Sequence, residues 1–595
     1  MVILCRFGTS FIKLNNRTIY KNTIPKINGS KLCSTQVSRQ ANDNTFVPFM
    51  TMIQNRRAQA SRSILVQVQS AKSYNELYSY CSTIGEVKDM LHYSDNSEQM
   101  HFIIVEFKNE LDVNKILSVS SHIQENQTVP VQSPFLWFRA PNNKLGKLKQ
   151  NKTAKLLVEN GTSVISEENL KTALSHCTSV SAQIQELYML TKLNDVGQRL
   201  RFITAKQIES TVSGLFPNVC AYPFGSSVNG FGKMDCDLDL VLKLTGHKEN
   251  ENSRLIYHCK AGSGSDRNMN QKNMEVLGDF IHLFLPGCSH VRRILQARIP
   301  ILKYHQQLTN IECDLSMTTM SGVYMSDFLY LMGEIDNRVR PLIFVIRKWA
   351  KEVFLTNNSP GKWISNFSLT LLALAFLQRP LHSPPILPTF NTLVKHAAPS
   401  DHFITEDGIN CTFLRDITKL KFKKENDKSL ESLLFEFFEF YSQFDFENKA
   451  ICLNEAASIS KPEHSALYIV NPLERGLNVS KNVSYDELER FKIEVRNAAW
   501  LLESQESSQT YKGLLGIFQN KYNAKYKLNF AASTKHNRLM DVSDLFEGEN
   551  NESGESHINF KNKQIEKQVS DIRKKTKENI KALEVTQKQK KSKKI

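Results

Sequence analysis

Two aspartates near the middle of the chain, Asp237 and Asp239, have the spacing that most directly indicates chemistry. They lie in the segment CDLDLVL, in which apolar and acidic residues alternate as they do along a strand. Side chains two residues apart on a strand point to the same face, so both carboxylates share one face, opposite the apolar residues Cys236, Leu238 and Leu240. Two like charges held this close repel each other, and a divalent metal ion relieves that repulsion.

A turn of small residues precedes this strand. Gly225 and Ser226 offer backbone N–H groups and a hydroxyl, which are suitable donors for phosphate oxygens. Gly-Ser followed after a gap by Asp-hydrophobic-Asp resembles the signature of the nucleotidyltransferase superfamily of the DNA polymerase beta type. The resemblance implies that Asp237 and Asp239 are catalytic metal ligands and that Gly225 and Ser226 bind nucleotide phosphates.

The same resemblance implies a third carboxylate on a neighbouring strand. In the segment IECDLS, apolar residues alternate with Glu312, Asp314 and Ser316, which places these three on the polar face. We expect Asp314 to be the third catalytic metal ligand, with Glu312 as the alternative. Asp235 has the same parity as Asp237, but it lies where a turn residue is expected.

Beyond Gly322 the chain is predicted to be mostly helical. Arg347 and Lys351 are four residues apart and share a helix face, which by itself is more typical of a solvated basic face. This part of the chain resembles the central and poly(A)-polymerase-associated domains of non-templated ribonucleotidyl transferases. The resemblance implies that Arg347 and Lys351 bind the triphosphate. Asn366 and Phe367 align with a Ser-Tyr pair that contacts phosphate and stacks on the base; Asn still donates and Phe still stacks, but the tyrosine hydroxyl is lost.

Four segments together are similar to mitochondrial poly(A) polymerases: FGSSVNGFGKMDCDLDL, NRVRPLIFVIRKWA, SPGKWISNFSLT and LYIVNPLERGLNVSKNVS. The resemblance implies a template-independent adenylyltransferase with ATP and an RNA 3′ end as substrates. The RNA 3′-hydroxyl would attack the α-phosphate and release pyrophosphate, with two Mg²⁺ (or Mn²⁺) ions held by Asp237, Asp239 and Asp314. Asp314 would either hold the metal ion that acidifies the hydroxyl or accept its proton.

Two other functions compete with this interpretation. A terminal uridylyltransferase would share every residue named above and differ only in its contacts to the base edge. An inactive RNA-binding scaffold belongs to a different class of protein, and the presence of all three carboxylates disfavours it.

The charge of the chain is concentrated at its ends. Residues 1–42 contain seven Lys and Arg and no Asp or Glu, and residues 561–595 carry a net charge of +9, whereas the whole chain carries +16. The middle is therefore neutral overall. An acid-free basic leader predicts a mitochondrial transit peptide and a location in the matrix, although a nucleic-acid-binding arm has the same composition. The longest apolar run, residues 369–377, is too short to span a bilayer, so no membrane insertion is expected.

Residues 61–133 form a separate small unit in this interpretation. Strand and helix patterns follow in the order βαββα, which resembles an RNA-recognition motif (RRM). The strand HFIIVEFK lacks most of the aromatic residues that stack on bases, with Phe107 as the clearest one present. We therefore expect this unit to form a homodimer through an edge strand or an apolar sheet face, and the family resemblance also implies a homodimer.

The predicted fold is a multidomain α+β chain with a nucleotidyltransferase palm, meaning a small mixed β-sheet with helices. The expected boundaries are a transit peptide at 1–42, the RRM-like domain at 61–133, and the palm with its preceding helices at 164–322. A mostly helical central and poly(A)-polymerase-associated domain follows at 323–505, and a charged, disordered basic tail at 540–595.

Overall fold

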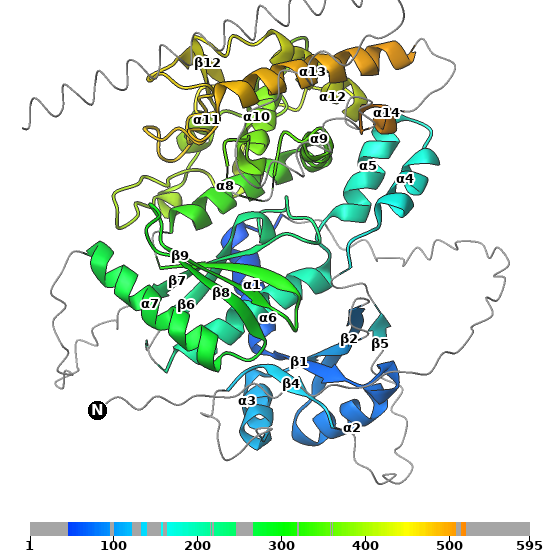
Figure 1. The fold of residues 1–595 in the computed structure, drawn as a ribbon, viewed down its shortest axis with the longest axis vertical. Helices are drawn as coiled ribbons and strands as arrows, with labels where there is room; N and C mark the ends of the chain where they lie inside the picture. The colour runs from blue at the N-terminus through cyan, green and yellow to red at the C-terminus, as the bar shows by residue number, and fades with distance from the viewer. Residues whose placement is uncertain are drawn as a thin grey trace, which may run out of the picture. The chain divides into compact units, whose positions relative to one another are not determined.

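The computed structural model describes residues 46–518, apart from 96–99, 122–131, 140–155, 159–162, 215, 217–218, 245–265, 318–319, 358, 360 and 507–512. The predicted leader and basic tail lie outside the described residues. The described part contains two five-stranded sheets, and more of its elements are helices than strands (Figure 1). None of its helices combines the length and hydrophobicity that crossing a bilayer requires.

The predicted palm is present as a mixed five-stranded sheet. Its strands, in spatial order, are β6 (Val219–Phe224), β7 (Leu238–Leu244), β10 (Ile311–Ser316), β9 (Ile301–Gln306) and β8 (Cys288–Ile294). The pair β7–β10 is parallel and the other three pairs are antiparallel. Helix α6 (Asp195–Val212) packs on β6 and β7, and α7 (Asp266–Phe284) packs on β8 and β9.

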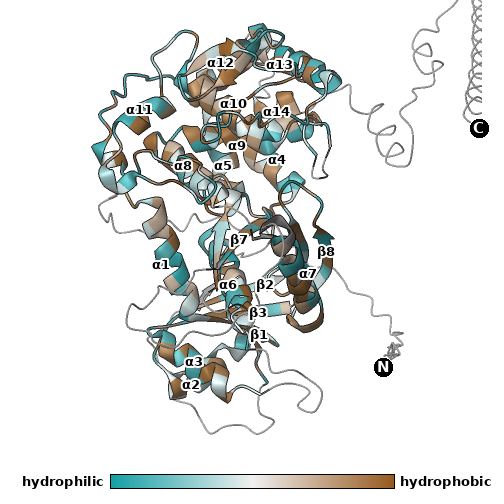
Figure 2. Ribbon diagram, turned by 90° about the vertical axis from the view of Figure 1, so that its left-hand side faces the viewer, coloured by the Kyte–Doolittle hydropathy of each residue, from teal (hydrophilic) through white to brown (hydrophobic). Residues whose placement is uncertain are grey.

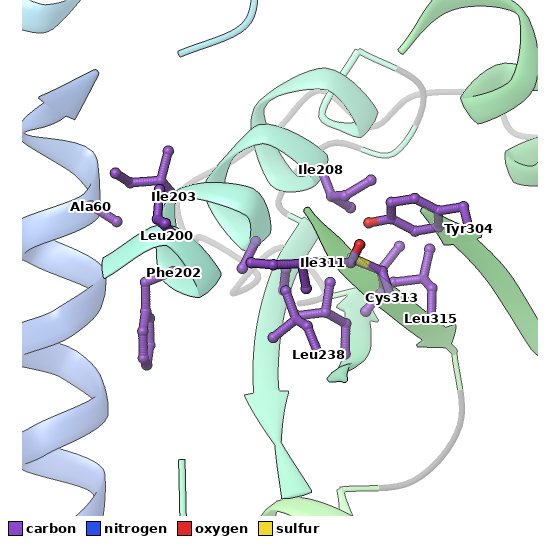
Figure 3. Close-up of a cluster of buried hydrophobic side chains, with 14 of the residues drawn as sticks. Ala60, Leu200, Phe202, Ile203, Ile208, Leu238, Tyr304, Ile311, Cys313 and Leu315 are labelled. Atoms are coloured by element: carbon purple, nitrogen blue, oxygen red, sulfur yellow. The ribbon is translucent and has the colours of Figure 1, made fainter. Parts of the chain in front are cut away.

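The apolar face of this sheet packs against α6. Leu238, Cys313 and Leu315 are fully buried, and Figure 3 shows them gathered with Tyr304 of β9 and Ile208 of α6. This confirms the predicted strand parity, because the residues between these apolar positions are the aspartates. The core therefore fixes which face of the sheet carries the carboxylates.

The N-terminal sheet contains the predicted βαββα order. The elements are β1 (Ser63–Val68), α2 (Tyr74–Ile84), β2 (Val87–Asp95), β3 (Met100–Phe107) and α3 (Glu110–Val119). Two short edge strands, β4 (Phe135–Trp137) and β5 (Leu156–Val158), pair in parallel with β1 and β2 and give the order β4-β1-β3-β2-β5. Both helices carry hydrophobic and hydrophilic bands along their length (Figure 2).

The structure corrects one expectation for this sheet. Phe107, which the sequence presents as a stacking aromatic, is completely buried. It packs in a cluster with Leu77 and Cys81 of α2 and Val113 and Ile116 of α3. The parity of β3 directs its side chain toward the helices, so Phe107 is not available to an RNA base.

The opposite face of the sheet is also covered. Leu65, Tyr93, Phe102 and Ile104 belong to one core cluster with α1 (Phe49–Ser61) and α6. The expectation that this apolar sheet face mediates self-association is therefore wrong, because the same chain already buries it. Among the described residues of this unit, the sheet edges and the outer helix surfaces are what is left for a partner.

A buried carboxylate joins the N-terminal sheet to the palm helix α6. Glu106 of β3 is fully buried and accepts hydrogen bonds from Arg199 of α6 (2.6 Å), Lys88 (2.9 Å) and Gln59 (3.1 Å). Burial alone raises the pKa of Glu106, but the hydrogen bonds from Lys88 and Arg199 outweigh it and leave the pKa lowered. Glu106 is therefore a charged contact between the N-terminal sheet and a palm helix that is distant in sequence.

The remainder of the described chain is mostly helical, as predicted. Helix α9 (Val339–Glu352) lies at its centre and packs against α5 (Val180–Thr191), α10 (Asn366–Gln378) and α12 (Leu430–Gln443). Its apolar residues are buried, whereas Arg347, Lys348 and Lys351 are not. The other elements are α4 (Glu167–Ser175), α8 (Ser321–Ile335), α11 (Phe390–Lys395), α13 (Tyr485–Glu506), α14 (Leu514–Phe518) and a hairpin of β11 (Lys449–Cys452) and β12 (Ala457–Ser460).

Replacing Arg199 with alanine should destabilise the chain, because it removes a charged partner of the buried Glu106 carboxylate. We expect a loss of about 2 kcal/mol, seen as a lower midpoint of thermal unfolding. Lys108→Ala is the matched control, since Lys108 pairs with an exposed glutamate, Glu86, and should cost less than about 1 kcal/mol. Equal midpoints for the two variants would contradict the role of the Arg199–Glu106 pair in joining the N-terminal sheet to α6.

Candidate active site

The register of the two parallel strands brings two of the predicted carboxylates together. Asp239 of β7 lies directly opposite Asp314 of β10, and Phe224 of β6 lies opposite Asp239 on the other side. Adjacent strands are about 4.8 Å apart, so the side chains of a directly opposed pair are close neighbours. Both carboxylates are half-buried.

Asp237 immediately precedes β7 and is exposed. Its backbone carbonyl accepts a 2.7 Å hydrogen bond from the Ser227 hydroxyl. In the residues just before Asp237, the carbonyls of Met234 (3.3 Å) and Cys236 accept hydrogen bonds from the buried guanidinium of Arg201 on α6. The backbone that carries Asp237 is therefore held from both the Gly-Ser turn and the palm helix.

Gly225 packs directly against the Asp239 carboxylate. Its φ angle is +72°, and a Cβ atom at this position would overlap the carboxylate oxygen of Asp239. Its N–H, which the sequence offers to phosphate, instead donates to the Ser326 hydroxyl of α8 at 2.7 Å. Gly225 therefore allows the turn to approach Asp239, while the half-buried Ser226 lies next to it in the same turn.

Repulsion between the carboxylates changes their acidity. The pKa of Asp239 is raised to about 7, first by burial and then by the charges of Asp314 and Asp237. The pKa of Asp237 is also raised, first by desolvation of its carboxylate and then by the charge of Asp314. The charge of Lys303 opposes both shifts. The three aspartates therefore form one electrostatic unit.

Lys303 of β9 lies opposite Asp314 on the other side of β10. Its ammonium nitrogen is 2.6 Å from each carboxylate oxygen of Asp314. Glu312, the alternative third carboxylate, lies one pleat away, is exposed, and raises the pKa of Asp237 through its charge. Asp235 is exposed in a turn and forms a 2.8 Å ion pair with Lys233, as expected for a turn residue.

Three of the predicted nucleotide-binding residues line one cavity of about 140 Å³: Arg347, Lys351 and Asn366. Arg347 donates a 2.7 Å hydrogen bond to the carbonyl of Phe231, in the loop that leads to Asp237. Phe367 is half-buried at the start of α10 and is not among the residues lining this cavity. The loop from Phe231 to Asp237 thus connects the basic cavity with the carboxylates.

Several positioning residues were not identified from the sequence. Ser227, Arg201 and Ser326 act through backbone groups, and nothing in the sequence indicates which carbonyl or N–H a side chain will reach. Lys303 did leave a signal: in ILKYHQ it has the polar-face parity of a strand that precedes IECDLS by a short turn. A hairpin between these strands would place Lys303 near Asp314.

The donor set is suitable for a hard divalent cation. Within the described ranges, no three His, Cys, Asp or Glu side chains form a ready-made metal site. Mg²⁺ does not require one, because it is usually bound by one or two carboxylates together with substrate phosphates. The mutual repulsion of Asp237, Asp239 and Asp314 is the electrostatic condition that such a cation relieves.

Comparison with protein families identifies two segments of the chain. Residues 180–334 match the family model described as the central palm domain of mitochondrial-like poly(A) RNA polymerase. Residues 429–477 match the model described as Cid1 family poly A polymerase. The first match spans the strands that carry Asp237, Asp239 and Asp314.

Related proteins cover most of the chain. The mitochondrial poly(A) RNA polymerase of Drosophila melanogaster is 46% identical over 550 residues, which are 88% of this chain and 89% of the relative. The Homo sapiens protein of the same name is 34% identical over 470 residues, or 78% of each chain. The crystal structure of mtPAP in complex with ATPgammaS superimposes with a TM-score of 0.71 and 32% identity, and covers 79% of this chain and 99% of that one. The chain belongs to the mitochondrial poly(A) polymerase family and is a polynucleotide adenylyltransferase.

Proposed function

We propose that this poly(A) polymerase transfers AMP from ATP to an RNA 3′ end at the face of β7 and β10 that carries Asp237, Asp239 and Asp314. The observation that carries the proposal is the register of the two parallel strands, which sets Asp239 opposite Asp314. Asp237 and Asp239 would hold a divalent cation, Mg²⁺ or Mn²⁺. When bound, that cation would supply positive charge for the phosphates and for the attacking hydroxyl.

The residues around the carboxylates would bind and orient the nucleotide. The Ser226 hydroxyl would donate to a phosphate oxygen, and Gly225 allows the turn to lie against Asp239 without a side chain between them. Arg347 and Lys351 would neutralise triphosphate charge; Arg347 keeps donors beyond the one used on Phe231. Asn366 and Phe367, in the first turn of α10, would contact phosphate and stack on the base.

Asp314 would act on the RNA end of the reaction. Its carboxylate would hold the cation near the 3′-hydroxyl or accept the hydroxyl proton. ATP as the nucleotide is supported by the poly(A) polymerase relatives and by mtPAP solved with ATPgammaS. mtPAP has also been solved with UTP, so a bound nucleotide in a relative does not by itself define base choice.

The N-terminal unit at 61–133 is proposed to be an RRM-like domain that does not bind RNA through its sheet. Its element order supports the likeness, and both faces of the sheet are covered within the chain.

We also propose the remaining domain boundaries as the sequence predicts them: the transit peptide, the palm at 164–322, the helical domain at 323–505 and the basic tail. Import into the matrix is supported by the acid-free leader, and protease protection of the imported chain would test it.

A homodimer through this N-terminal unit is the proposed assembly. Exposed apolar side chains support it. Leu111 on α3 is 70% exposed, and Trp137 is 51% exposed on β4, the edge strand that extends the sheet of this unit just beyond residue 133. Trp137→Glu should give a monomer by light scattering, because it places a charge in the contact. Trp500→Glu on α13, where Trp500 is 65% exposed, is the control and should stay dimeric. A monomeric wild-type chain would refute the assembly.

Asp237→Asn, Asp239→Asn and Asp314→Asn should each reduce the extension of an oligoribonucleotide with ATP by at least about 10²-fold. The amide keeps the size of the side chain but removes the charge, so circular dichroism should report an unchanged fold. Glu312→Gln and Asp235→Asn are the matched controls and should have mild effects. If Glu312 proves essential and Asp314 dispensable, the assignment of the third carboxylate is wrong.

The raised pKa of Asp239 predicts a pH dependence of folding stability without metal. The folded chain keeps this proton up to about pH 7, whereas the ordinary value is 3.8. The folded state therefore binds more protons between these values, and stability should fall as the pH rises from about 4 to about 7 and then level off. Unfolding midpoints in EDTA would show this slope, and Asp239→Asn should reduce it. The exposed Asp407→Asn is the control; a slope unaffected by Asp239→Asn would contradict the prediction.

A further inference from the structure

Lys303 is a cation inside the cluster of active-site carboxylates. Its ammonium lies 2.6 Å from both oxygens of Asp314, and the cross-strand register sets the two residues directly opposite each other. Both side chains are largely shielded, with 25% of Lys303 and 19% of Asp314 exposed. An ion pair with this geometry is held by the sheet and is stronger than an exposed surface pair.

The influence of Lys303 extends beyond Asp314. Its positive charge also acts on Asp237 and Asp239, where it opposes the mutual repulsion of the carboxylates. Without this cation, three negative charges would face one another in a partly desolvated site. In the metal-free chain, Lys303 therefore provides some of the positive charge that a bound divalent cation would otherwise provide.

We propose that Lys303 is the resident counter-ion of the active site. Its ammonium pairs with Asp314 in the metal-free chain and must move away when a divalent cation binds to Asp314. The inference rests on the proposed role of Asp314 as a metal ligand. Both oxygens of Asp314 are engaged by the ammonium, so a cation and Lys303 compete for the same ligand. Lysine suits this exchange because its ammonium is a compact charge on a flexible stem.

The competition links metal binding to nucleotide binding. While Lys303 holds Asp314, the site offers a cation few free ligands, and its affinity for metal alone is lowered. A nucleotide contributes phosphate oxygens, which add ligands and negative charge and shift the balance toward the cation. Lys303 is thus a positioning residue that favours metal binding together with the nucleotide.

The test measures the affinity of the full chain for Mn²⁺ without nucleotide, with binding detected by electron paramagnetic resonance. Lys303→Met removes the competing charge while keeping an unbranched side chain, so Mn²⁺ should bind about tenfold more tightly than to the wild type. Lys303→Arg keeps the charge and should bind no more tightly than the wild type. Lys243→Met is the matched control. Lys243 lies on β7 with the same strand parity as Asp239 and pairs with Glu406 at 2.8 Å. This variant should bind Mn²⁺ with an affinity within about twofold of the wild type.

A double-mutant cycle separates this inference from the proposed function. Asp314→Asn should weaken Mn²⁺ binding, and in that background Lys303→Met should no longer tighten it, because the shared ligand is gone. If Asp314→Asn weakens binding but Lys303→Met alone does not tighten it, the counter-ion role is wrong and the role of Asp314 stands. If Asp314→Asn leaves Mn²⁺ affinity unchanged, the proposed role of Asp314 fails, and the role of Lys303 fails with it. Unfolding midpoints in EDTA confirm that each variant is folded.

Discussion

The parallel pairing of β7 with β10 is the constraint on which the active site depends. It places Asp239 directly opposite Asp314, and the strand parity adds Asp237 at the same face. Like charges at this spacing repel one another, and the pKa of Asp239 rises to about 7 as a result of burial and of its acidic neighbours. The surrounding structure has to hold this unfavourable arrangement in place until a cation and a nucleotide compensate it.

Three kinds of contact hold the three aspartates together. The apolar sides of the two strands are buried against α6, so the carboxylates cannot turn away without exposing the core. Arg201 and the Ser227 hydroxyl bind backbone carbonyls next to or at Asp237. Lys303 pairs with Asp314 and supplies the opposite charge. The N-terminal sheet supports α6 in turn, through a shared core and through the pair of Arg199 with the buried Glu106.

Strand parity made the carboxylate positions predictable from the sequence. Alternation in CDLDLVL and IECDLS is a local property, and it correctly separated the buried residues from the aspartates. The contacts of single polar groups were not predictable, because they depend on which segments meet in space. Gly225 illustrates this: its N–H was expected to face phosphate but donates to Ser326, about a hundred residues later. Phe107 was misjudged for a related reason, since alternation does not show which face of a sheet the helices cover.

The proposed active site is tested most directly by a crystal structure of the chain with Mn²⁺ and a non-hydrolysable ATP analogue, with the metal located by anomalous scattering. Anomalous density should lie in contact with carboxylate oxygens of Asp237 and Asp239, and within reach of Asp314, with the analogue's phosphates beside Ser226 and Arg347. Lys303 should then have moved off Asp314. Metal density at Glu312 or Asp235 instead, or a nucleotide bound away from β7 and β10, would contradict the assignment of the three aspartates.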